Sequence, residues 1–192
     1  MQAKEYDYYT PEEYLEFEIN SPERHEYING EIIPMTGGLP NHNRLVLNLA
    51  SALNFALRQQ AYDVFVTDQR LWIPKQRIHT YPDIMVVEGS LQLQTGRRDT
   101  ITNPLLIVEV LSKSTQTYDQ GNKFKFYRTI PSFQEYILID QYSIHVEQYY
   151  KTESNQWIFS EKDGEESILK FSKIPFEIVL ADIYNKVDFE AE

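Results

Sequence analysis

The run Leu-Leu-Ile-Val-Glu-Val-Leu at residues 105–111 constrains the fold more than any other feature of the chain. An apolar run of this kind, without polar alternation, is typical of a strand buried on both faces near the middle of a sheet. Its one charged member is Glu109. A carboxylate in such a strand carries a large desolvation cost unless a cation or several hydrogen-bond donors meet it. The sequence therefore predicts an acid in the protein core that needs a partner.

A second acid opens another apolar run. Asp83 follows Pro82 and precedes Ile-Met-Val-Val, and it lies 26 residues before Glu109. Two carboxylates on adjacent strands supply the oxygen ligands that Mg²⁺ (or Mn²⁺) prefers and leave other positions for water and a phosphate. Taken alone, each acid is better explained by a structural role, with Asp83 capping a turn and Glu109 pairing with a buried Arg or Lys.

A third element follows in the segment 119–127, where Asp119, Lys123 and Tyr127 recur at four-residue spacing. In a helix these side chains share one face. Lys123 could then face the metal site, where an ammonium can hold an attacking water and stabilise the charge that grows on phosphorus. The spacing by itself favours the alternative, an ordinary solvent-exposed Asp119–Lys123 pair.

The remaining patterns predict a β-rich chain of 192 residues that forms one domain, 1–192. A capping box at Thr10 and Glu13 begins a helix to about Phe17, and Asn29-Gly30 predicts a hairpin over 25–35. A leucine stripe predicts a long amphipathic helix over 41–59, and a further helix is expected over 119–129. Strands are expected at 62–67, 69–73, 82–87, 104–111, 136–140, 144–149, 156–160 and 167–171, with a closing stretch at 176–185.

Composition narrows the function classes. The chain has no cysteine, which excludes disulfides and thiolate chemistry, and no window approaches a membrane-spanning length, so we expect a cytoplasmic protein without membrane contact. The net charge of -11 is uneven, because residues 41–130 hold 11 Lys/Arg against 7 Asp/Glu while both flanks are acidic. A local anion-facing cleft is therefore compatible with an acidic protein, although acidic flanks also serve solubility alone.

The ordered set of motifs resembles the Uma-two (Uma2) family of restriction-endonuclease-like proteins. The likeness runs from about Thr10 to Asp140 and rests on Tyr27-Ile28-Asn29-Gly30-Glu31, His42, Pro82-Asp83-Ile84, Pro104, Glu109-Val110-Leu111-Ser112, Ser114-Thr115, Asp119, Lys123, Tyr127 and Glu135-Tyr136. The resemblance implies a PD-(D/E)XK core of the α/β (α+β, β-rich) class, a mixed sheet flanked by helices. It also implies Asp83 and Glu109 as ligands of Mg²⁺ or Mn²⁺ in an endodeoxyribonuclease.

One departure from the superfamily pattern concerns the lysine. The pattern has a lysine two residues after the second acid, and Leu111 occupies that position here. Lys113 lies four residues beyond Glu109 and does not replace it cleanly. The resemblance makes Lys123, on the following helix, the candidate substitute.

The resemblance also draws attention to weaker candidates. Glu26 could complete the site as an upstream acid or be a solvent-facing strand residue, and His42 could point into the cleft or help to cap its helix. Phosphates could be steered by Arg44, Lys113 and Lys125, although a solvated surface charge explains each of them as well. Two functions remain open: a nuclease that acts on nucleic acid, with DNA as the expected substrate, and a catalytically weak nuclease-fold module for binding or scaffolding. A homodimer is expected, without a motif that demonstrates it.

Overall fold

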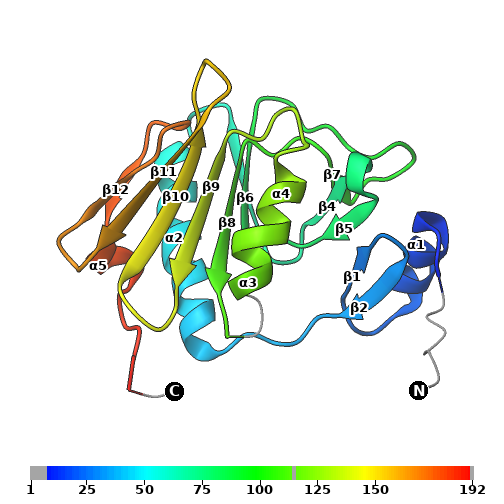
Figure 1. Cartoon of the computed structure of the whole chain (residues 1–192), viewed down its shortest axis with the longest axis horizontal. Helices are drawn as coiled ribbons and strands as arrows, with labels where there is room; N and C mark the ends of the chain where they lie inside the picture. The colour runs from blue at the N-terminus through cyan, green and yellow to red at the C-terminus, as the bar shows by residue number, and fades with distance from the viewer. Residues whose placement is uncertain (1–7, 114–115, 191–192) are drawn as a thin grey trace.

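The computed structural model describes residues 8–113 and 116–190. It contains a six-stranded sheet in the order β11-β10-β9-β8-β6-β3, a five-stranded sheet in the order β2-β1-β5-β4-β7, and a two-stranded sheet of β12 and β13. Figure 1 shows α2 behind the six-stranded sheet and the α3–α4 segment in front of it. The predicted mixed sheet with flanking helices is confirmed.

The elements have the following bounds. The strands of the first half are β1 (His25–Ile28), β2 (Glu31–Pro34), β3 (Tyr62–Val66), β4 (Arg70–Ile73), β5 (Ile78–Thr80), β6 (Ile84–Glu88) and β7 (Thr100–Ile101). Those of the second half are β8 (Leu106–Leu111), β9 (Glu135–Asp140), β10 (His145–Lys151), β11 (Trp157–Asp163), β12 (Ile168–Lys170) and β13 (Glu177–Val179). The helices are α1 (Pro11–Asn20), α2 (Pro40–Leu57), α3 (Gln116–Tyr118), α4 (Phe124–Tyr127) and α5 (Leu180–Ile183), with a 3-10 turn η1 (Pro74–Gln76) and a π-helical turn η2 (Asp119–Lys123).

Strand β8 lies inside the six-stranded sheet, parallel to β9 and antiparallel to β6. Because side chains alternate along a strand, its two faces enter different hydrophobic clusters. Val108 and Val110 join the cluster that contains the buried leucines of α2, while Ile107 and Leu111 join the one beneath α4. Glu109 therefore points to the face that α3, η2 and α4 cover, and it is only 3% exposed.

The segment α3–η2–α4 is the crossover that returns the chain from β8 to the parallel strand β9. It begins at Gln116, three residues before the predicted start, and ends at Tyr127, two residues before the predicted end. Its middle turn is π-helical, and such turns occur frequently at functional sites. Helical pattern alone could not predict this local widening.

Local signals near the N-terminus were confirmed. Thr10 accepts the Glu13 backbone N–H at 3.2 Å and the Glu13 carboxylate accepts the Thr10 N–H at 2.7 Å, which completes the capping box. Asn29 and Gly30 both have positive φ, 47° and 106°, as a type I′ hairpin turn requires. The first helix continues to Asn20, three residues beyond the predicted end.

The five-stranded sheet was not predicted as a separate unit. Its strands β5 and β7 are only three and two residues long, too short for a periodic pattern. The predicted runs at 62–67 and 69–73 enter different sheets, as β3 and β4. Pairing of β1 with β5 brings the N-terminal hairpin to the rim of the candidate site. None of the described helices combines the length and apolar character needed to cross a bilayer.

His79 in β5 gives a testable dependence of stability on pH. Its ring is fully buried, stacks on Trp72 at 4.1 Å between centroids, and lies 2.9 Å from Gln94 Oε1. Burial lowers the pKa of His79 to about 4. The unfolded chain, with an ordinary histidine pKa of about 6.5, binds more protons below that pH, so stability falls as pH drops from about 6.5 to about 4.

We expect the free energy of unfolding to lose about 3 kcal/mol from this residue across that window. Urea unfolding of the wild type and of His79→Gln, each at neutral pH and near pH 4, measures this loss of stability. The wild type should lose more stability on acidification than the variant. Parallel losses in the two proteins would show that His79 is not the titrating group.

Candidate active site

A cleft of about 1190 Å³ lies at the end of the six-stranded sheet where β8 and β9 finish. In Figure 1 the tips of these strands, the start of α2 and the α3 turn lie together at the lower end of the sheet. Residues from both large sheets, α2 and η2 line the cleft. Among them are the predicted site residues Glu26, His42, Asp83, Glu109, Lys113 and Lys123.

The two acids meet as the sequence predicted. Asp83 immediately precedes β6, and β6 pairs with the strand that carries Glu109. The backbone N–H of Asp83 donates to Glu109 Oε2 at 3.4 Å, and the N–H of Val110 donates to Asp83 Oδ2 at 2.8 Å. The backbone of one acidic strand thus orients the carboxylate of the other.

Lys123 lies beside this pair, on the π-helical turn. Its Nζ is 3.1 Å from Glu109 Oε1 and 3.1 Å from Asp119 Oδ1, and its side chain is 12% exposed. The i,i+4 pair with Asp119 forms, but it is buried and not solvent-exposed as the alternative expected, and it coexists with the contact to Glu109. Burial opposes the charge on Lys123, but Glu109 and Asp119 raise its pKa well above the ordinary lysine value.

Tyr127, one turn further along, completes the contacts of Glu109. Its hydroxyl donates to Glu109 Oε1 at 2.7 Å, and the tyrosine is fully buried. Burial raises the pKa of Glu109 to about 8, against the opposing effect of Lys123. Burial likewise raises the pKa of Tyr127, with Glu109 adding to the effect. The tyrosine therefore acts here as a hydrogen-bond donor.

His42 and Glu26 enter the site from other elements. His42, in the first turn of α2, places Nε2 at 3.2 Å from Asp83 Oδ2. Burial opposes protonation, but the hydrogen bond with Asp83 and its charge raise the pKa of His42 above the usual value. Glu26, on β1, accepts a hydrogen bond from the hydroxyl of Thr80 and lines the cleft.

Comparison with known proteins identifies the family of this chain. The family model Uma2, described as "Putative restriction endonuclease", matches residues 11–181. The chain belongs to the Uma2 family. It is 44% identical over 163 residues to "Uncharacterized protein sll1609" of Synechocystis sp., an alignment that covers 85% of this chain and 92% of the relative. A second Synechocystis sp. relative, "Uncharacterized protein slr1290", is 34% identical over 149 residues, covering 78% of this chain and 77% of the relative.

A solved structure supports the fold of this Uma2 protein. It is described as the crystal structure of "a putative nuclease belonging to DUF820" from Anabaena variabilis ATCC 29413, and it aligns with a TM-score of 0.74 at 21% identity. The alignment covers 92% of this chain and 97% of the other. The likeness establishes a nuclease-like fold.

The Uma2 chain does not bring every predicted residue to the cleft. Arg44 donates to Asn41 Oδ1 at 2.9 Å, and Lys125 is exposed on α4; neither is among the residues that line the cleft. Helical rotation explains both positions, because neighbours on a helix point in different directions. Lys113 does line the cleft. Ser114 and Thr115 of the matched motif set lie outside the described residues.

Sequence reasoning missed Tyr118, Gln141 and Tyr142, which also line the cleft. Tyr142 lies in the turn between the strands expected at 136–140 and 144–149. The signal that could have identified it is its position shortly after a strand that runs parallel to the Glu109 strand. Within residues 8–113 and 116–190, no three His, Asp or Glu side chains form a complete metal-ligand cluster. Asp83 and Glu109 are linked through the Asp83 N–H, and Asp83 is also held by the Val110 N–H.

Proposed function

We propose that this Uma2 protein is a divalent-metal-dependent endonuclease that hydrolyses phosphodiester bonds of nucleic acid, with DNA as the expected substrate. The observation that supports it best is the meeting of Asp83 and Glu109, from adjacent strands, with the buried Lys123 in one cleft. An acid pair beside a lysine suits the hydrolysis of a phosphate ester. Membership of the family agrees with this proposal.

The donor set of the cleft fits a hard cation. Glu109 and Asp119 are both buried, Asp83 is nearby, and Lys123 is the lysine that faces the first two. Among the described residues, these three carboxylates outnumber the two cationic groups that face them, Lys123 and His42, and their oxygens are ligands that a hard cation prefers. Mg²⁺ commonly binds through one or two carboxylates, with waters and substrate oxygens filling its other positions, so the pair Asp83 and Glu109 suffices. When bound, the ion would supply Lewis-acid polarisation of the phosphoryl group.

Each protein group then has a definite task. Lys123 Nζ is placed to orient an attacking water and to stabilise negative charge on the phosphate. Glu109 and Asp119 hold the ammonium, and Tyr127 fixes Glu109. His42 and the Val110 N–H hold Asp83 Oδ2, so that the acid enters the reaction already oriented.

The proposal is tested by incubating purified protein with supercoiled plasmid and with short single- and double-stranded oligonucleotides. Mg²⁺, Mn²⁺ and EDTA are compared. We expect cleavage with either metal and none with EDTA. The proposal is overturned if folded protein cleaves no substrate with either ion, or if EDTA leaves cleavage unchanged.

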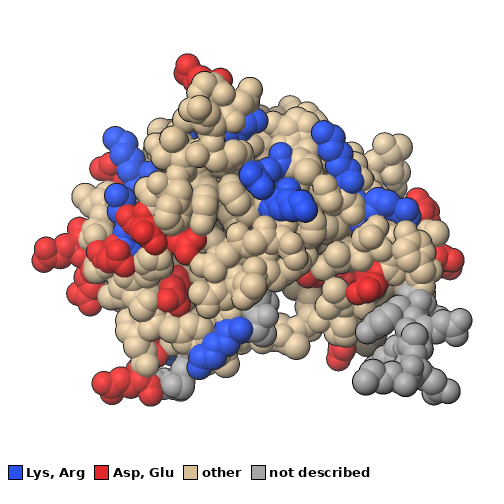
Figure 2. All heavy atoms as spheres, in the orientation of Figure 1, with Lys and Arg blue, Asp and Glu red and all other residues tan. Residues whose placement is uncertain are grey.

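The rival function is a nuclease-fold module without chemistry. It is favoured by Leu111, which fills the usual lysine position and is buried in the cluster beneath α4. Figure 2 adds acidic side chains gathered at the left edge, over the β10–β12 region, with Lys and Arg across the upper middle. Calorimetric titration with Mn²⁺ separates the two, since saturable binding that is lost in Asp83→Ala contradicts a scaffold without a metal site.

A further inference from the structure

Lys113 and Tyr142 form a pair beside the two acids. Lys113 lies two residues after β8 and Tyr142 two residues after β9, and because these strands are parallel, both residues emerge at the same edge of the sheet. Lys113 Nζ is 4.9 Å from the centroid of the Tyr142 ring, and the Lys113 N–H donates to the Tyr142 hydroxyl at 3.3 Å. Both line the cleft that contains Asp83 and Glu109.

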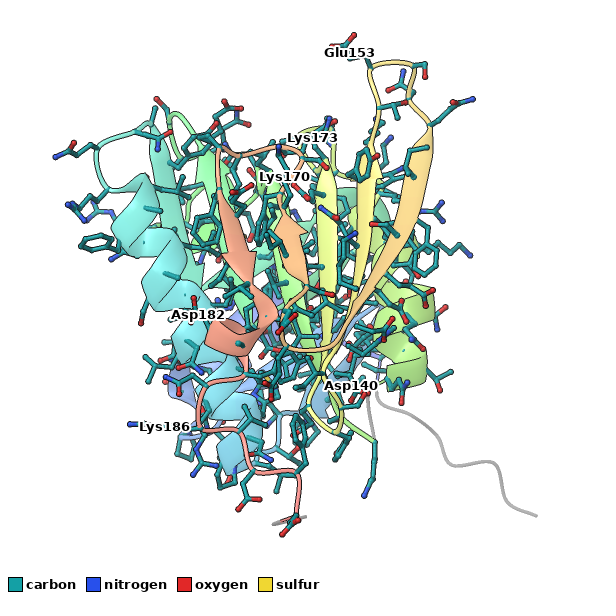
Figure 3. The ribbon with its side chains drawn as sticks, turned by 90° about the vertical axis from the view of Figure 1, so that its left-hand side faces the viewer. Asp140, Glu153, Lys170, Lys173, Asp182 and Lys186 are labelled. Atoms are coloured by element: carbon teal, nitrogen blue, oxygen red, sulfur yellow. The ribbon has the colours of Figure 1, made fainter. Side chains whose placement is uncertain are left out.

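The turn that carries Tyr142 is fixed by hydrogen bonds. Asp140 Oδ1 accepts the Tyr142 N–H at 2.8 Å, and Asp140 Oδ2 accepts the Ser143 hydroxyl at 2.7 Å. The Tyr184 hydroxyl lies 2.8 Å from the carbonyl oxygens of both Asp140 and His145. Figure 3 shows Asp140 at the lower end of the sheet, far from Glu153 at the opposite turn. Because the aromatic ring is held in advance, a ligand that stacks on it orders little additional structure.

A buried acceptor without a donor among the described residues belongs to Gln141, the residue before Tyr142. Gln141 is 1% exposed and donates through Nε2 to the Leu111 carbonyl at 2.7 Å. Its Oε1 receives no hydrogen bond from any residue that the structure describes, although Gln141 lines the cleft. An unpaired buried acceptor is costly. Gln141 therefore ties the Tyr142 turn to the end of β8 and leaves its own Oε1 unsatisfied within the described part of the chain.

The charge of the cleft restricts how a nucleic acid can bind. Its lining includes the acids Glu23, Glu26, Asp68, Asp83, Glu109 and Asp119. The Lys and Arg residues in that lining are Arg24, Lys113 and Lys123. A duplex is bound largely through neutralisation of many phosphates by basic groups, which this lining does not provide. Stacking of unpaired bases on an aromatic ring adds binding free energy that does not come from phosphate neutralisation, and paired bases in a duplex cannot supply it.

We propose that Tyr142 and Lys113 form a nucleotide subsite that selects single-stranded nucleic acid. The base next to the scissile phosphate stacks on Tyr142, and Lys113 moves from the ring to the adjoining phosphate. Lys113 is exposed and its contact with the ring is a weak surface interaction, so this movement is inexpensive. The inference rests on the proposed nuclease function and specifies its substrate class.

Binding is measured without cleavage, by fluorescence anisotropy of a labelled short oligothymidylate in Ca²⁺. We expect the single strand to bind more tightly than a duplex of equal length. Tyr142→Ala should weaken single-strand binding about tenfold or more, and Tyr142→Phe, which keeps the ring, should stay close to the wild type. Tyr150→Ala is the matched control, because Tyr150 lies outside the cleft and should leave affinity unchanged.

An oligonucleotide with abasic sites adds an independent measurement. It should bind the wild type as weakly as the intact strand binds Tyr142→Ala. If Tyr142→Ala, with an unchanged thermal midpoint, binds and cleaves like the wild type, the subsite is wrong while the nuclease proposal stands. If the folded wild type neither binds nor cleaves any oligonucleotide, both proposals fail together.

Discussion

Replacing Asp83 with asparagine is expected to lower metal-dependent cleavage by about a thousandfold. The change preserves the size of the side chain and an oxygen that can accept the Val110 N–H, now bonded at 2.8 Å, but it removes the charge that would hold the metal. Loss of several kcal/mol of metal-based stabilisation in the transition state corresponds to a rate effect of this order. Initial rates with Mn²⁺ at saturating substrate measure it.

Asp63→Asn provides the control for Asp83→Asn. Asp63 is an exposed residue on β3, the strand that pairs with β6, and it is not among the cleft-lining residues. Loss of one negative charge at Asp63 should leave the initial rate of cleavage within about a factor of two of the wild-type rate. Equal losses in both variants would indicate a general charge effect, and an unchanged rate in Asp83→Asn would remove this acid from the proposed metal site.

Replacing Lys123 with methionine should affect both stability and cleavage. Methionine keeps the apolar stem but removes the ammonium that faces Glu109 and Asp119, each 3.1 Å away. Breaking a buried ion pair from one side typically costs about 3–5 kcal/mol, so urea unfolding at neutral pH should show a loss of that order. Cleavage should fall by about a hundredfold or more, as expected for loss of a group that orients the attacking water and stabilises charge on the phosphate.

Lys125→Met is the matched control on the same helical segment. Lys125 is exposed on α4 and is outside the cleft lining, so its removal should change the free energy of unfolding by no more than about 0.5 kcal/mol. A stable but inactive Lys123→Met would assign the lysine to chemistry alone. Full activity in that variant would eliminate Lys123 as the substitute for the lysine missing at position 111.

Asp83 and Glu109 could be predicted from the sequence because each is a charged residue next to or within an apolar run. Glu109 is a single carboxylate within an apolar strand, and Asp83 stands at the start of another, so pattern alone located both. The structure places them on adjacent strands, as expected. The spacing of Lys123 from Asp119 could not predict its role, because a solvent-exposed pair has the same spacing. The expectation that Lys123 points toward the acids came from the family resemblance.

Other parts of the site depend on tertiary contacts that no local pattern contains. The bond between His42 and Asp83 joins α2 to the start of β6, and the position of Tyr142 follows from the parallel pairing of β8 with β9. Arg44 and Lys125 lie outside the cleft lining, because a charged residue in the sequence does not reveal the direction of its side chain on a helix. The strands β5 and β7 were missed because they gain their structure from neighbours rather than from their own sequence.

The location of Lys123 in the crossover between β8 and β9 makes the site depend on the position of that connection. Glu109 belongs to β8 and Asp83 immediately precedes its partner strand β6, whereas Lys123 reaches them from the connection that lies over the sheet. A partly assembled chain, or one whose crossover has opened locally, therefore lacks the complete set of reacting groups. In the proposed nuclease, cleavage would therefore require a closed crossover as well as the two acids.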